Sequence, residues 1–102
     1  MNRIEKLKEF LGQNEKDDFI KHALALEYIK ADDDAAAEKL FVDILKNNPA
    51  YTGSYYHLAK LYERNGKEQA AIKTYQDGMA ATKENDKHSY NELRAAFEEL
   101  TM

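Results

Sequence analysis

The sequence contains no cysteine, one proline and four glycines among its 102 residues. Without cysteine the chain forms no disulfide, no thiolate metal site and no cysteine nucleophile. The single proline, Pro49, and the small number of β-branched residues leave long stretches rich in Ala, Leu, Glu and Lys. These residues are strong helix formers, so the composition predicts an all-α protein.

Long apolar runs are also missing. No segment approaches 18 consecutive apolar residues, so we expect no transmembrane helix. The first eight residues are amphipathic and lack the apolar core of a signal peptide. The net charge is −4, which gives no general attraction to nucleic acid or to an anionic membrane. We therefore expect residues 1–102 to form a single cytoplasmic domain with neither of these partners.

The clearest feature that is present is a pattern that occurs twice, 34 residues apart. The matching segments are Leu24-Ala25-x-x-Tyr28 with Leu58-Ala59-x-x-Tyr62, and Ala37-x-x-x-Phe41 with Ala71-x-x-x-Tyr75. A fixed period of this length is typical of stacked helical repeats. Such stacks usually build a binding surface rather than a reaction centre.

Hydrophobic spacing and helix-capping residues predict six helices. They cover about residues 2–13, 18–31, 35–47, 53–65, 68–83 and 88–100. Asp17 or Asp18 is suited to cap the second helix, and one aspartate of the run 32–34 to cap the third. A solvated, capping turn explains this run better than a calcium loop, because consecutive aspartates point in diverging directions.

The paired segments resemble the tetratricopeptide repeat family. The resemblance implies a right-handed superhelix of antiparallel helix pairs. In it, Ala25 faces Ala37 and Ala59 faces Ala71, so that the helix axes approach closely. The sequence departs from the family pattern at three positions. Lys21 stands where the family prefers Trp, Lys83 replaces the closing proline of the second repeat, and Asp32 stands where the second repeat has Gly66.

Extending the period outward divides the whole chain into repeat units. Residues 1–14 are expected to be the second half of a preceding repeat, because Phe10 lies 34 residues before Ile44. Residues 18–51 and 52–85 form two repeats, and residues 87–101 form a capping helix. Arg94 takes the position of Ala59 there, which suits a helix at the end of a stack.

The resemblance also implies a concave groove, lined by the first helix of each pair, that binds a protein or peptide. The candidate groove residues are His22, Leu26, Ile29, Lys30, Tyr56, His57, Lys60, Glu63, Arg64 and Asn91, with His88 and Ala95 beside them. Leu26 and Ile29 are expected either to form an exposed apolar strip or to cover neighbouring helices. The carboxylate clamp known in this family is absent, and Glu92 would repel an acid at its position.

The sequence contains no motif for catalysis or for a cofactor. The only plausible bases near neutral pH are His22, His57 and His88, and no phosphate loop, metalloprotease motif or nucleophile elbow is present. We therefore expect a non-catalytic protein without a cofactor. A metal site formed by the three histidines is a minor alternative. RNA recognition is disfavoured by the 34-residue period and the net acidity.

Self-assembly is the main alternative to peptide binding. The first helix begins in the middle of a repeat, so under this alternative its apolar residues are expected to present more surface than one neighbouring helix covers. These residues are Ile4, Leu7, Phe10 and Leu11.

Overall fold

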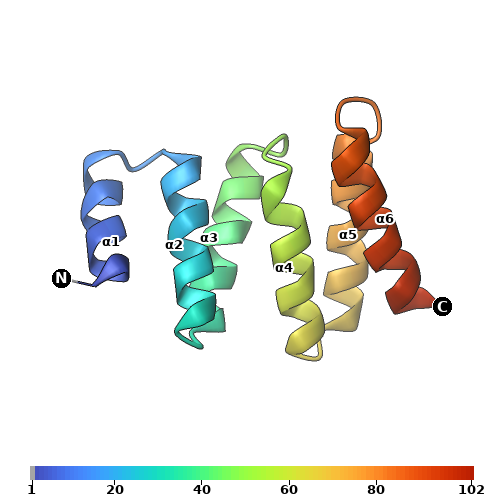
Figure 1. The fold of residues 1–102 in the computed structure, drawn as a ribbon, viewed down its shortest axis with the longest axis horizontal. Helices are drawn as coiled ribbons and strands as arrows, with labels where there is room; N and C mark the ends of the chain where they lie inside the picture. The colour runs from blue at the N-terminus through green and yellow to red at the C-terminus, as the bar shows by residue number, and fades with distance from the viewer. Residues whose placement is uncertain (1) are drawn as a thin grey trace. The chain divides into compact units, whose positions relative to one another are not determined.

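A computed structural model describes residues 2–102 and contains six α-helices in that range (Figure 1). They are α1 (Arg3–Gln13), α2 (Asp18–Lys30), α3 (Asp34–Asn47), α4 (Gly53–Arg64), α5 (Glu68–Thr82) and α6 (Lys87–Thr101). No strand occurs in the part of the chain described. Each helix begins and ends within one residue of its predicted bounds, so the all-α prediction is confirmed.

Side-chain caps explain where four of the helices begin. In each, a side-chain oxygen accepts a hydrogen bond from the backbone N–H three residues later, which satisfies one otherwise unpaired donor of the first turn. The capping residues are Asn2, Asp17, Asp33 and Asp86, with N···O distances from 2.9 to 3.2 Å. Asp33 belongs to the aspartate run, so the prediction of a capping turn there is confirmed.

The first compact unit extends to Asn47 and contains α1, α2 and α3. Helix α2 packs against both other helices, and α2 and α3 run antiparallel (Figure 1). The core of this unit consists of Leu7, Leu24, Ala25, Ala37, Phe41 and Ile44.

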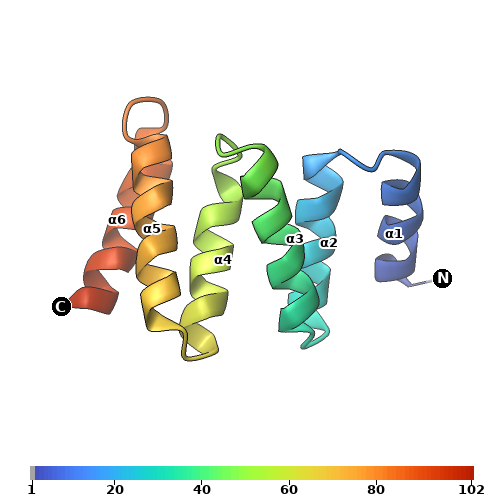
Figure 2. The same ribbon diagram turned by 180° about the vertical axis from the view of Figure 1, so that it is seen from behind.

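The second compact unit runs from Asn48 to the end of the chain and contains α4, α5 and α6. Helix α5 packs against both other helices, and α4 also touches α6 (Figure 2). The apolar core of this unit consists of Tyr55, Leu58, Ala59, Leu61, Ala71, Tyr75, Leu93 and Ala96.

The four signature alanines are completely buried within the two helix pairs. Ala25 and Ala37 are 0% exposed in the α2–α3 pair, and Ala59 and Ala71 are 0% exposed in the α4–α5 pair. A side chain of one carbon lets two helices approach closely at such positions. The predicted role of the repeated alanines as small core residues is therefore confirmed.

A glycine allows an equally close approach in the second unit. A Cβ atom on Gly78 would lie 2.8 Å from Tyr55 Cβ and 2.9 Å from Leu93 Cδ1. Tyr55 is held in place there, because its hydroxyl donates a 2.7 Å hydrogen bond to the carbonyl oxygen of Pro49. Gly78 therefore makes room for the Tyr55 side chain and for α6 at the same point of α5.

Candidate peptide-binding face

Three of the predicted groove residues lie along one side of α4. Tyr56, Lys60 and Glu63 follow each other at intervals of four and three residues, which places them on one face of a helix. The ammonium nitrogen of Lys60 lies 5.6 Å from the ring centroid of Tyr56 and 3.6 Å from Glu63 Oε2. All three residues are half-buried. We call these three residues the α4 face. It combines an aromatic ring with an ion pair, both accessible to a partner.

Glu63 also has a second role, inside the helix pair. The hydroxyl of Tyr75, a fully buried residue on α5, donates a hydrogen bond to Glu63 Oε2. Burial raises the pKa of the Tyr75 hydroxyl, and the hydrogen bond to Glu63 raises it further, so the phenol remains a proton donor. Glu63 therefore connects α4 to α5, and only part of its capacity to accept hydrogen bonds is open to a ligand.

His57 lies beside the α4 face and is half-buried. Its ring meets the Tyr56 ring edge to face, with 5.9 Å between the centroids. Burial lowers the pKa of His57, and the charge of Glu92 on α6 opposes this effect only in part. His57 therefore offers a neutral imidazole to a partner at pH 7.

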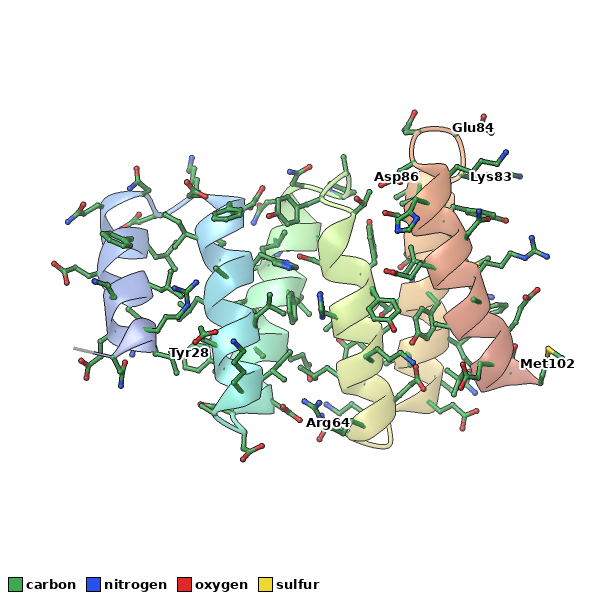
Figure 3. All side chains as sticks on the ribbon, in the orientation of Figure 1. Tyr28, Arg64, Lys83, Glu84, Asp86 and Met102 are labelled. Atoms are coloured by element: carbon green, nitrogen blue, oxygen red, sulfur yellow. The ribbon has the colours of Figure 1, made fainter. Side chains whose placement is uncertain are left out.

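The other predicted groove residues of the second unit are exposed. Arg64 lies in the last turn of α4 (Figure 3), where a positive charge interacts favourably with the helix dipole. On α6, His88, Asn91 and Ala95 are also exposed.

The predicted groove residues of the first unit all lie on α2. His22 is half-buried, and its ring meets the Phe41 ring edge to face with 5.5 Å between the centroids. Leu26 and Ile29 are half-buried as well, so each both covers the core and keeps some accessible surface. Lys30 is exposed and pairs with Glu27 at 3.1 Å.

Sequence reasoning did not foresee the ion pair between Lys21 and Asp43 in the first unit. The Lys21 side chain is only 10% exposed, and its ammonium nitrogen lies 2.7 Å from Asp43 Oδ2. This hydrogen bond holds the pKa of Asp43 below its ordinary value, despite the desolvation that opposes it. The available signal was Lys21 itself, a charged residue at an otherwise apolar signature position. Its partner lies 22 residues away and has no signature of its own.

Two findings bear on other kinds of site. Within residues 2–102, no three His, Cys, Asp or Glu side chains gather in an arrangement that could hold a metal ion. Across the same residues, every helix is too short or too polar to cross a bilayer.

Comparisons with known proteins identify the fold. A crystal structure of a tetratricopeptide repeat domain protein from Salinibacter ruber is 37% identical in sequence, with a TM-score of 0.78, and the match covers 83% of this chain and 96% of that one. A solution NMR structure of such a domain from the same organism is 38% identical, with a TM-score of 0.79, and covers 82% and 86%. No family model matches the sequence, and no curated protein is significantly similar to it.

A more distant structure agrees in fold. A protein from Bordetella parapertussis has a TM-score of 0.83 at 22% identity, over 99% of this chain and 89% of that one. The repeated signatures, the buried alanine pairs and the Salinibacter ruber structures lead to one conclusion: the chain belongs to the tetratricopeptide repeat family.

Proposed function

We propose that this protein is a non-catalytic scaffold that binds a segment of another protein through the α4 face. The observation that carries the proposal is the Tyr56–Lys60 contact. An aromatic ring and a cation lie together on a side of α4 that keeps solvent-accessible surface after α4 has packed against α5. Tyrosine is one of the side chains that contribute most of the energy at protein interfaces.

The partner's chemistry follows from these groups. An apolar side chain of the partner packs on the Tyr56 ring, and a carboxylate near it pairs with Lys60 or Arg64. Asn91 and the neutral His57 supply hydrogen bonds. In the first unit, α2 offers a partner a similar mixture of apolar and basic groups, from His22, Leu26, Ile29 and Lys30.

Affinity capture with three variants tests this function. Tyr56→Ala and Lys60→Glu should lose the partners that the unaltered protein retains, while Lys73→Glu should keep them. Lys73 is a matched control because it is an exposed, ion-paired lysine on α5. Calorimetry on the purified partner then measures the affinity. Identical partners and equal affinities for all four proteins would refute the assignment to the α4 face.

One observation favours self-assembly as a second candidate. Phe10 on α1 is 47% exposed, whereas Ile44, the residue at the equivalent repeat position, is fully buried. A second copy that covers Phe10 would remove this apolar surface from water. Light scattering should then give a dimer mass that falls to the monomer mass for Phe10→Glu or without residues 1–13. A monomer at all concentrations would exclude this role.

A further inference from the structure

The first unit has a cleft on the side of α2 that faces away from the predicted groove residues. Two open hollows of about 370 and 460 Å³ adjoin each other, since both are lined by Leu24, Leu40 and Asp43. The first also includes Tyr28, Ala36 and Lys39, and the second Lys8, Leu11, Gly12, Glu15 and Lys21. Tyr28 lies on the side of α2 nearer to α1 in Figure 3. We call the two hollows together the outer cleft.

The outer cleft and the predicted groove use opposite faces of α2. Lys21, Leu24 and Tyr28 fall within about 60° of one another around a helix that turns 100° per residue. The groove candidates of α2 cluster on the other side of the same helix. A ligand in the outer cleft therefore leaves the groove candidates free.

Lys21 places unused hydrogen-bond donors in this cleft. A lysine ammonium has three N–H donors, and within residues 2–102 the one acceptor bonded to Lys21 is Asp43. The side chain as a whole is nine-tenths buried, while its partner Asp43 is half-exposed and the hollow that both residues line is open. A bound carboxylate would therefore add a charge-assisted hydrogen bond to the ammonium at the wall of the cleft.

Helix pairing does not require a lysine at this position. The equivalent residue of the second repeat is Tyr55, whose hydroxyl is satisfied by Pro49 within its own unit. An aromatic side chain therefore serves this register position without a charge. The second repeat thus pairs its helices without a counterpart of the contact between Lys21 and Asp43.

The charge around the cleft favours a carboxylate. Residues 1–47 contain eight basic and eleven acidic residues, yet the cleft is lined by three lysines and two carboxylates. Lys8 and Lys39 are exposed and form no ion pair with any residue of the described chain. Glu15 and Asp43 limit the negative charge that the cleft can accept, which favours one carboxylate over a dianion such as phosphate.

We propose that the outer cleft is a second binding site, which takes an acidic, apolar peptide segment of another protein. Two aliphatic side chains of the segment enter the two hollows and pack on Leu24 and Leu40. An acidic side chain between them accepts hydrogen bonds from the unused donors of Lys21. Lys8 and Lys39 attract the same carboxylate from the rim.

A small peptide pair tests this site on the unaltered protein. Acetyl-Leu-Glu-Leu-amide is titrated into ¹⁵N-labelled protein, and acetyl-Leu-Gln-Leu-amide serves as its uncharged counterpart. We expect the Glu peptide to change the chemical shifts of the backbone amides of Lys21, Leu24 and Leu40, with a Kd on the order of millimolar. The Gln peptide should bind roughly tenfold more weakly. Equal binding of the two peptides, or no shifts at these amides, would overturn the proposal.

A lysine variant connects the effect to Lys21. Lys21→Met should weaken the binding of the Glu peptide about tenfold and leave the binding of the Gln peptide unchanged. Lys73→Met in the second unit should change the affinity for neither peptide. Asp43 is half-exposed in the unaltered protein, so the loss of Lys21 does not leave a buried carboxylate unpaired. If Lys21→Met does not fold, the difference in affinity between the Glu and Gln peptides on the unaltered protein still tests the proposal. Shifts confined to Tyr56 and Lys60 would support the α4 face and refute the outer cleft.

Discussion

Asp32 and Gly66, at equivalent positions of the two repeats, both adopt the left-handed backbone conformation, with φ of 61° and 76°. Each follows the first helix of its pair. In both turns, the N–H groups of this residue and of the next one donate to carbonyls of the last helical turn at 2.8 to 3.1 Å. This is the Schellman arrangement, which usually requires glycine. Asp32 therefore adopts a backbone conformation that glycine adopts more easily, because aspartate carries a side chain.

Replacing Asp32 by glycine should therefore stabilise the protein. Relief of the strained φ should stabilise the folded state by about 1 kcal/mol. Glycine also gives the unfolded chain more conformational freedom, which offsets part of this gain. We expect a net gain of about 0.5 kcal/mol in the free energy of unfolding, measured by urea denaturation. Gly66→Ala is the converse change and should cost about 1 kcal/mol. A loss of stability in Asp32→Gly would contradict the role assigned to this turn.

Gly78→Ala should destabilise the second unit. The added methyl group would overlap Tyr55 and Leu93, and relief of such overlap in a packed core costs about 1–3 kcal/mol. Gly12→Ala is the matched control, since no atom lies within 4 Å of the added Cβ. Gly12 lies in α1, where alanine is the better helix former, so this variant should gain about 0.5 kcal/mol. Equal effects in thermal melts would show that the overlap is relieved without cost.

Tyr75→Phe should lose about 2 kcal/mol of stability, because it removes a hydrogen bond to the Glu63 carboxylate from a buried site. Tyr90→Phe removes the same hydroxyl group from a half-buried residue, so it should change the free energy of unfolding by no more than about 0.5 kcal/mol. A double-mutant cycle with Glu63→Gln isolates the pairwise energy. A coupling energy of zero would mean that the contact adds nothing to the α4–α5 pair.

The stability of the protein should fall on acidification in a way that depends on His57. Burial lowers the pKa of His57 in the folded state, so the unfolded chain binds a proton first as the pH falls. The stabilisation from the neutral ring is complete above the unfolded value of about 6.5 and is lost as the pH falls below it, at no more than about 1.4 kcal/mol per pH unit.

His57→Gln tests this prediction. Urea midpoints measured between about pH 7.5 and 5.5 should show a smaller acid-induced loss for His57→Gln than for the unaltered protein. His88→Gln, which removes an exposed histidine of α6, is the matched substitution for comparison. A pH dependence that is the same in all three proteins would exclude His57 as its source.

The helices and their pairing were predictable because their signals are local or strictly periodic. The Asp17 cap and the end of α2 depend on neighbouring residues, and the buried alanines recur at a fixed interval. The family resemblance also gave Tyr56 and Lys60 as groove candidates, and the structure has them in contact on α4.

The contacts between helices were not predictable in the same way. The hydrogen bond from Tyr75 to Glu63 and the ion pair of Lys21 with Asp43 depend on how far each helix extends past its partner and on side-chain rotamers. Neither feature repeats, because the equivalent of Lys21 is Tyr55. The outer cleft was missed for the same reason: the period identifies its apolar floor as core and says nothing of the lysines around it.

The close fit of Tyr55 against Gly78 also bears on how the chain avoids misfolding. Two repeats with nearly the same signature can exchange partners during folding, a characteristic failure of repeat proteins. If α4 paired with α3 as it pairs with α5, Tyr55 would meet Ile44 in place of a glycine. If α2 paired with α5, Lys21 would leave the space beside Gly78 unfilled. Unequal side-chain volumes at one crossing therefore penalise both wrong pairings, although the rest of the signature permits them.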